Sequence, residues 1–195
     1  MSDPISPDAD SSTPLSAEER EGLKLSYVST RGDLNAAEQQ NILRARAWAL
    51  SRRNNVLSRD YLNDLHKRMY GDVWTWAGTY RRSEKNIGID PLQIQTELQE
   101  LINNASYWVT HATYPPDEIA ARFHHQLVFI HPYPNGNGRH ARLAADILVR
   151  ELGQPPFTWG SLSLVDPSET RHSYINALRA ADGHDFRLLM EFVRS

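Results

Sequence analysis

The chain has 195 residues, of which 40% are hydrophobic, and it contains no cysteine. This length suits one domain with a substantial core, and the lack of cysteine excludes disulfides and thiolate metal sites. The net charge of -3 disfavours broad nucleic-acid binding, no apolar run approaches the roughly 20 residues of a membrane span, and no signal-peptide core is present, so we expect a cytoplasmic protein with no membrane partner.

Residues 1–20 are rich in Ser, Pro and acidic residues and lack aromatic residues, which predicts a disordered tail before a single domain at 21–195. In that domain, apolar residues recur at helical spacing and predict a mainly α-helical fold. The expected helices span 36–53, 58–70, 92–110, 116–130, 139–152, 169–181 and 186–193. Asn35 is the predicted N-cap of the first helix, with Glu38 completing a capping box.

An irregular segment at residues 78–89 separates the second and third expected helices. Its β-favouring residues surround a polar turn and predict a small β-hairpin. Within it, the basic pair Arg81-Arg82 is typical of a solvated face, and Lys85 is also expected in solvent. A plain surface hairpin is therefore one interpretation of this segment.

The most informative stretch runs from His131 to Arg142 and reads His-Pro-Tyr-Pro-Asn-Gly-Asn-Gly-Arg-His-Ala-Arg. A glycine turn that opens a helix presents unpaired N–H groups and a partial positive charge, and arginine side chains match phosphate oxygens. His131 closes the preceding expected helix, and its ordinary pKa lies near neutrality, so it suits proton transfer. Taken singly, the histidine and the Gly-Asn-Gly turn have plain structural interpretations. Their combination in one loop predicts a catalytic site that binds polyphosphate.

This stretch resembles the signature of the Fic family, in which His-Pro-Phe is followed by an acidic residue, Gly-Asn-Gly-Arg and a second arginine. Further segments that resemble Fic domains follow the expected order, at residues 66–70, 74–78 and 174–178. The span from about Leu25 to the C-terminus looks like the Fic subgroup called mobile mystery protein B. The resemblance implies an all-α, Fic-type helical bundle with a small β-hairpin flap.

The resemblance also implies a protein adenylyltransferase, which moves AMP from ATP to a Ser, Thr or Tyr hydroxyl of a target protein. His131 would be its general base. The implied phosphate-binding residues are Gly136, Asn137, Gly138, Arg139 and Arg142. The flap would bind the target protein by main-chain hydrogen bonds, at residues Arg82, Ser83, Glu84, Lys85, Asn86 and Ile87. Family context implies a bacterial protein with a small DNA-binding partner.

Asn135 stands where the family has a carboxylate that binds Mg²⁺. Its neutral amide predicts weaker magnesium binding, because Mg²⁺ prefers anionic oxygen. Two alternatives therefore remain open. One is a related transferase with another phosphate-containing donor, and the other is a degenerate Fic module that binds a nucleotide or a protein without turnover.

Glu38 has an interpretation besides helix capping. In many Fic proteins a glutamate on an inhibitory helix pairs with the second arginine of the motif, which is Arg142 here. The surrounding residues depart from the usual inhibitory pattern. That pattern has Ser or Thr four residues before the glutamate, where this chain has Leu34, and Gly or Asn directly after it, where this chain has Gln39. An inhibitory Glu38–Arg142 pair is therefore a hypothesis beside the capping box.

Overall fold

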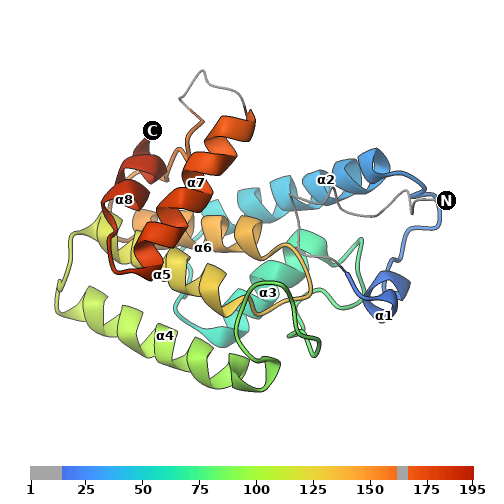
Figure 1. The fold of residues 1–195 in the computed structure, drawn as a ribbon, viewed down its shortest axis with the longest axis horizontal. Helices are drawn as coiled ribbons and strands as arrows, with labels where there is room; N and C mark the ends of the chain where they lie inside the picture. The colour runs from blue at the N-terminus through green and yellow to red at the C-terminus, as the bar shows by residue number, and fades with distance from the viewer. Residues whose placement is uncertain (1–14, 162–166) are drawn as a thin grey trace.

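A computed structural model describes residues 15–161 and 167–195 (Figure 1). Its helices in chain order are α1 (Ala17–Glu21), α2 (Arg31–Leu50), α3 (Arg59–Tyr70), the 3-10 helix η1 (Pro91–Gln93), α4 (Ile94–Thr110), α5 (Pro116–Ile130), α6 (Asn137–Glu151), α7 (Pro167–Asp182) and α8 (Arg187–Arg194). The described residues form helices and loops without a regular strand, which confirms the predicted all-α class. Across those residues, no helix is both long and apolar enough to cross a membrane.

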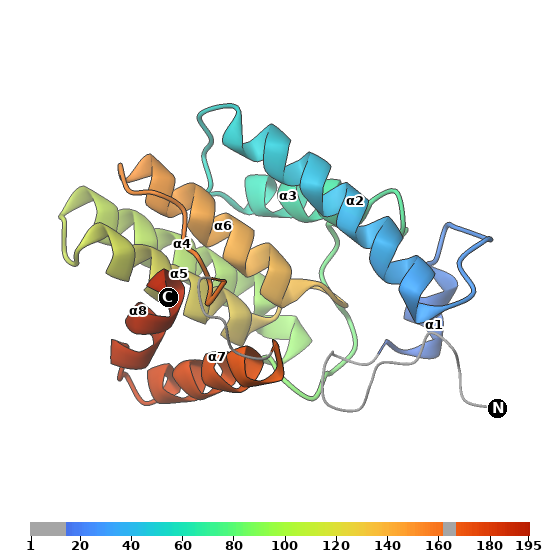
Figure 2. The same ribbon diagram turned by 90° about the horizontal axis from the view of Figure 1, so that it is seen from above.

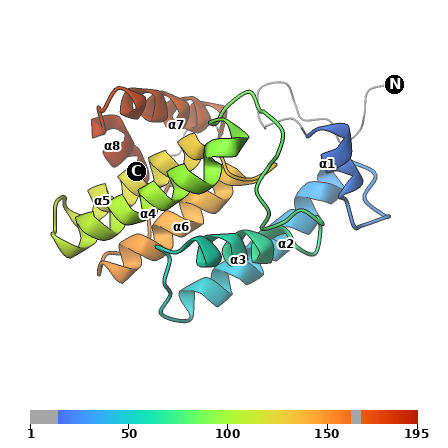
Figure 3. The same ribbon diagram turned by 90° about the horizontal axis from the view of Figure 1, so that it is seen from below.

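Helices α5 and α6 pack against each other at the centre of the fold. Figure 2 shows α2 and α3 side by side on one flank of this pair, and α7 with α8 on the other. Figure 3 shows α4 lying along α5. The core between them includes Phe123 and Leu127 of α5 and Ile147 of α6, all fully buried. The connection from α5 to α6 is therefore held by packed helices at both of its ends.

Helix α2 begins at Arg31, so the predicted start at Ala36 is wrong. Thr30 is the N-cap, and its hydroxyl accepts a hydrogen bond from the backbone N–H of Asp33. The Asp33 carboxylate accepts one from the Thr30 N–H in return, which completes a capping box. Glu38 therefore lies within α2, where it is buried, and does not cap the helix.

The segment predicted to be a β-hairpin is a loop between α3 and α4, which we call the flap loop (residues 78–90). No strand is assigned among these residues, so the hairpin is not formed. An isolated antiparallel bridge occurs instead between Leu23 and Trp74. The shape of the flap loop is set by side chains that bond to its backbone, as described below.

The predicted tail overlaps the described residues only from residue 15 onward. There, Ser16 caps α1 through a capping box with Glu19. The indole N–H of Trp76 donates to the backbone oxygen of Glu19 at 2.9 Å. The part of the chain that packs against the domain therefore begins before the predicted boundary at residue 21. The rest of the predicted tail, residues 1–14, lies outside the described residues.

Candidate active site

The predicted motif forms the connection between α5 and α6. His131 ends α5 in the left-handed conformation, with φ 54° and ψ 59°, and Pro132 follows it. Gly136 precedes α6 with φ 79°. A Cβ at Gly136 would lie 2.5 Å from the ring of Tyr70, so both the backbone conformation and the space require glycine. This short connection brings the histidine and the first turn of α6 to the same end of the central helix pair.

His131 is buried, with 5% of its surface exposed. Its Nδ1 lies 3.4 Å from the backbone oxygen of Val128. Because a carbonyl oxygen only accepts hydrogen bonds, this contact favours the tautomer with its proton on Nδ1 and leaves Nε2 as the basic nitrogen. Burial lowers the pKa of His131 to about 4, and the charges of Arg81 and Lys85 act in the same direction. The imidazole is therefore neutral at pH 7.

Tyr133 and Asn137 hold the motif loop in shape. The Asn137 side chain accepts from the Tyr133 N–H at 2.9 Å and donates to the Tyr133 carbonyl at 2.7 Å. The Tyr133 ring stacks on His66, with 3.8 Å between ring centroids. Its hydroxyl donates to Oδ1 of Asn63 at 2.9 Å. The hydroxyl that distinguishes this position from the usual phenylalanine therefore has a side-chain partner on α3.

His66 links the motif loop to the start of the flap loop. Its Nδ1 accepts from the backbone N–H of Gly78 at 2.9 Å, so the proton is on Nε2, which donates to the Asn135 carbonyl at 3.0 Å. Burial lowers the pKa of His66 well below its ordinary value. The neutral imidazole that both hydrogen bonds require is therefore maintained.

Asn135, the predicted magnesium ligand, accepts a hydrogen bond from the Gly136 N–H with its side-chain oxygen, at 2.6 Å. Within the ranges that the structure describes, no three His, Cys, Asp or Glu side chains gather in a way that could hold a metal ion. A neutral amide oxygen that is engaged by its own loop is a poor match for Mg²⁺. These residues therefore do not fit a magnesium site of their own.

Arg139 forms an ion pair with Glu38 of α2, with 2.8 Å between Nη1 and Oε2. The other carboxylate oxygen of Glu38 accepts from the indole N–H of Trp74 at 2.8 Å. Arg139 also lies over the ring of Tyr70, 5.2 Å from its centre. Burial alone would lower the pKa of Arg139, but Tyr70 and Glu38 outweigh that effect and raise it. Arg139 is therefore a charged group whose guanidinium is engaged by a buried carboxylate.

Arg142 faces a different element, so the hypothesised Glu38–Arg142 pair is not formed. Its guanidinium lies 4.5 Å from the centre of the Tyr174 ring on α7 and 5.9 Å from that of Trp159. The Tyr174 hydroxyl lies 3.0 Å from Nε2 of His124 on α5. Glu38 therefore engages the first arginine of the motif, while aromatic rings hold the second.

The flap loop contacts the histidine through Arg81 and Gly88. Nε of Arg81 donates to the His131 carbonyl at 2.7 Å. A Cβ at Gly88 would lie 2.6 Å from Cβ of His131, so the flap backbone touches the histidine directly. The flap loop is thus part of the wall around His131.

Lys85 and Ser83 of the flap loop bind Glu19 of α1. Lys85 Nζ lies 2.5 Å from Oε2 of Glu19, and the Ser83 hydroxyl donates to Oε1 at 2.8 Å. The Lys85 side chain is 3% exposed, which corrects the expectation of a solvated lysine. The other predicted target-binding residues are exposed on the flap loop: Arg82, Glu84, Asn86 and Ile87.

Arg81, Glu19 and His66 are site residues that the local sequence does not reveal. Arg81 is buried, whereas its neighbour Arg82 is exposed, although the two are alike in sequence. Each of the three contacts partners that are distant in the chain. One signal for Glu19 is present in the sequence, because Ser16 followed three residues later by Glu19 has the spacing of a capping box. That spacing indicates the start of a helix, but it does not indicate a contact with the flap loop.

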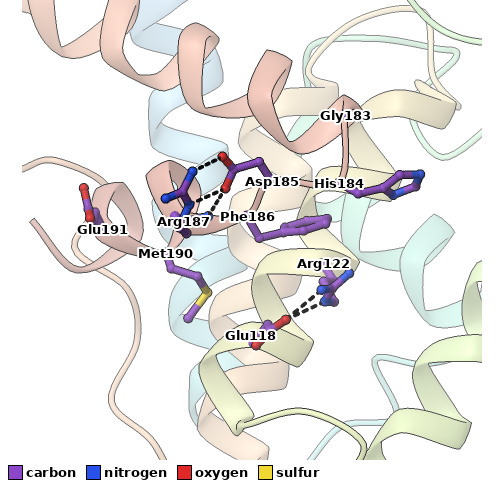
Figure 4. Close-up of a pocket in the computed structure, with 9 residues that line it drawn as sticks. All are labelled: Glu118, Arg122, Gly183, His184, Asp185, Phe186, Arg187, Met190 and Glu191. Carbon is purple, nitrogen blue, oxygen red and sulfur yellow. Dashed lines mark hydrogen bonds and ion pairs between the residues drawn. The ribbon is translucent and has the colours of Figure 1, made fainter.

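A separate pocket of about 600 Å³ lies between the start of α5 and the turn from α7 to α8 (Figure 4). Four of its charged side chains form ion pairs, Glu118 with Arg122 and Asp185 with Arg187, each at 2.7 Å. No residue of the motif lines it. The motif connection, and not this pocket, is therefore the candidate active site.

Residues 56–149 match the Fic/DOC family. The chain contains a Fic/DOC family domain. A Caenorhabditis elegans protein named protein adenylyltransferase fic-1 is 29% identical over 152 residues, which cover 74% of this chain and 28% of that protein. The Aedes aegypti protein adenylyltransferase Fic is 28% identical over 148 residues, with the same coverage of each chain. The Fic domain and its flanks thus span 28% of the length of these curated relatives.

Solved structures place the Fic domain among proteins of the same fold. C. elegans Fic-1 has a TM-score of 0.63 at 26% identity, over 89% of this chain and 55% of that one. BepC from Bartonella tribocorum, solved with bound AMPPNP, has a TM-score of 0.69 at 15% identity, over 91% of this chain and 96% of that one. At this low identity the likeness to BepC shows the fold alone.

Proposed function

We propose that the Fic domain is a protein adenylyltransferase that moves AMP from ATP to a Ser, Thr or Tyr hydroxyl of a target protein. The observation that carries this proposal is the joint arrangement at one connection of a neutral histidine, a glycine turn opening a helix, and two arginines. The names of the curated relatives support the reaction class.

His131 acts as the general base. Nε2 takes the proton of the target hydroxyl while the hydroxyl oxygen attacks the α-phosphorus of ATP. The bond from that phosphorus to the bridging oxygen breaks, and pyrophosphate leaves. The contact of Nδ1 with Val128 and the lowered pKa of His131 both support a neutral imidazole for this step.

The start of α6 binds the phosphates of the nucleotide. The first N–H groups of a helix have no acceptor within that helix, and they attract anions. Among the three predicted cradle residues, Gly136 donates its N–H to Asn135, so the amides of Asn137 and Gly138 carry this role. Arg139 in the first turn of α6 and Arg142 in the second turn add positive charge.

Glu38 restrains the nucleotide site. Its buried carboxylate engages Arg139, the first arginine of the motif, and the indole of Trp74 holds the carboxylate in place. A phosphate that binds Arg139 has to compete with this ion pair. We therefore infer that Glu38 is an inhibitory residue that acts on Arg139.

We propose that Mg²⁺ reaches the site bound to ATP. Because Asn135 supplies an amide oxygen that is already engaged, the chain contributes weakly to any Mg²⁺ that ATP carries. The same residue keeps the two alternatives open, another phosphate-containing donor or a nucleotide-binding or protein-binding module without turnover.

The finer assignments rest on the family resemblance. We infer that the chain is a bacterial member of the mobile mystery protein B subgroup, cytoplasmic, with a small DNA-binding partner. We also propose that the exposed flap residues bind the target, and that one Fic-like domain covers the chain after its tail.

The test of the proposed function uses α-³²P-labelled ATP with the purified protein, a cell extract and MgCl₂. We expect label on protein, and a loss of at least about 100-fold in His131→Ala, because general bases contribute rate factors of that size. ATP binding by the variant, measured by titration, should stay unchanged. Label that persists in His131→Ala would contradict the proposal. If ATP labels no protein in the extract but UTP or another donor does, the result would favour the alternative of a related transferase with another donor.

A further inference from the structure

We propose that Arg81 is a positioning residue that fixes His131 and the flap loop relative to each other for the transfer step. This inference rests on the proposed function, because it assigns Arg81 a part in that same reaction. Arg81 contacts the backbone around His131, and we assign it no contact with phosphate.

On the motif side, Arg81 binds three consecutive backbone carbonyls. Nε donates to His131 at 2.7 Å, Nη2 to Ile130 at 3.4 Å, and the Arg81 main-chain N–H to Pro132 at 2.9 Å. Arg81 is 2% exposed, so these bonds are formed away from water. They bracket the residue whose backbone is left-handed.

On the flap side, the same guanidinium binds both ends of the segment from residue 83 to residue 89. Nη1 donates to the Ser83 carbonyl at 3.0 Å, and Nη2 donates to the Ile89 carbonyl. Because no strand ladder is assigned in this loop, side-chain bonds of this kind define its shape. One side chain therefore joins both ends of the flap segment to the histidine.

The geometry requires arginine in particular. A planar guanidinium offers five N–H donors spread over three nitrogens in fixed directions, whereas a lysine ammonium carries its three donors on one nitrogen. The last carbonyls of α5 carry a partial negative charge, which a buried cation at that helix end offsets. A left-handed residue other than glycine persists only where its surroundings hold it. Here both Arg81 and the backbone at Gly88 contact His131.

Loss of this connection should affect transfer without affecting nucleotide binding. The phosphate-binding start of α6 has its own supports, the bonds between Tyr133 and Asn137 and the packing of Gly136 on Tyr70. The orientation of His131 and the place where the flap presents a hydroxyl both depend on Arg81. A small misplacement of reacting groups lowers rates strongly.

The test compares Arg81→Lys with Arg194→Lys. Arg194 is a matched control because it also donates to backbone carbonyls, those of Pro155 and Pro156, far from the motif. Three quantities are measured for each: label transfer from α-³²P-ATP at saturating ATP, the dissociation constant for ATP, and amide hydrogen exchange by mass spectrometry. The exchange measurement does not depend on activity.

For Arg81→Lys we expect at least about a tenfold loss of label transfer, since misplaced groups cost rate factors of this order or more. ATP affinity should stay within about twofold, and exchange should accelerate at residues 83–89, 130 and 131 while Tyr133 and the start of α6 stay protected. Transfer within twofold of the parent, or an equal loss in Arg194→Lys, would overturn the proposal.

If Arg81→Lys does not fold, Gly88→Ala tests the same contact from the flap side, since its Cβ would meet both His131 and Nη2 of Arg81. It should also lower transfer and accelerate exchange at residues 130 and 131, and an unchanged variant would again overturn the proposal. If the parent protein transfers no label, the proposed function fails by itself. The exchange pattern then still decides whether Arg81 holds the flap loop to His131.

Discussion

Substitution of Asn135 tests whether the neutral residue at the predicted metal position limits Mg²⁺-dependent transfer. Asn135→Asp keeps an oxygen that can accept the Gly136 hydrogen bond and adds the negative charge that Mg²⁺ prefers. We expect Mg²⁺-dependent label transfer to rise about tenfold, equal to about 1.4 kcal/mol of barrier. Initial rates over a MgCl₂ series measure this effect. Asn135→Gln, neutral and longer, serves as the control, and equal rates in all three proteins would contradict the prediction.

Glu38 can be tested with two variants that separate inhibition from stability. Glu38→Gln keeps an oxygen for the indole of Trp74 but releases Arg139, so we expect ATP to bind about tenfold more tightly, a change of about 1.4 kcal/mol. Isothermal titration with ATP measures this gain. Glu38→Ala should bind ATP equally well while losing about 1–3 kcal/mol of unfolding free energy, because the Trp74 N–H is left without its acceptor. Unchanged affinity in both variants would exclude an inhibitory role.

Local sequence predicts the identity of the motif residues better than their partners. The connection at His131 and the helix start after Gly136 follow from histidine, proline and glycine spacing over a dozen residues. The partner of Glu38 cannot be predicted from this spacing, because the choice between Arg139 and Arg142 depends on which side of α6 faces α2. The burial of Arg81 likewise depends on carbonyl groups that lie far along the chain.

Among the elements, long helices with periodic apolar residues are predicted closely, and α5 is predicted at both ends. The start of α2 is missed because Gly32 interrupts the helical pattern while Thr30 and Asp33 cap the helix around it. The flap loop is missed as an element because β propensity without a partner strand is not enough to form a ladder.

Helix α1 holds the flap loop through Glu19, and this contact is testable. Burial would raise the pKa of the Glu19 carboxyl, but hydrogen bonds from Lys85, Ser16 and Ser83 outweigh it and lower the pKa. Glu19→Gln removes the charge opposite the buried Lys85. We expect a loss of about 1–3 kcal/mol in unfolding free energy and faster amide exchange at residues 83–87.

Urea unfolding and hydrogen exchange measure these two effects. Glu21→Gln, an exposed position on the same helix, is the matched control and should leave both unchanged. Unaltered exchange at 83–87 in Glu19→Gln would mean that α1 does not restrain the flap loop.

Over the whole molecule, buried histidines make stability depend on pH. Burial lowers the pKa of His124 to about 3 and those of His131 and His140 to about 4, and it also lowers that of His66. From pH 6.5 down to about 4, the unfolded chain binds more protons at these sites, so acidification favours unfolding. Asp146 acts in the opposite sense, because burial raises its pKa to about 6 and the folded state takes up that proton first.

Burial also raises the pKa of Glu151, so two carboxyls act against the four histidines. Because the histidines are more numerous, we expect the free energy of unfolding to be lower at pH 5 than at pH 7.5. Each net proton contributes about 1.4 kcal/mol per pH unit, and urea titrations at a series of pH values measure the slope. A flat profile would show that the histidines titrate alike in both states.

The bond from Arg81 to the His131 carbonyl joins residues 50 positions apart. Helix α5 can gain its turns from local contacts, but the left-handed backbone at its end depends on a segment that precedes α4. Contacts of long sequence separation form late, because they pay loop-closure entropy first. We therefore expect a folding chain to form its helices before the left-handed backbone at His131 is fixed. Partly folded molecules would then have native helix content while His131 is not yet held in its native position.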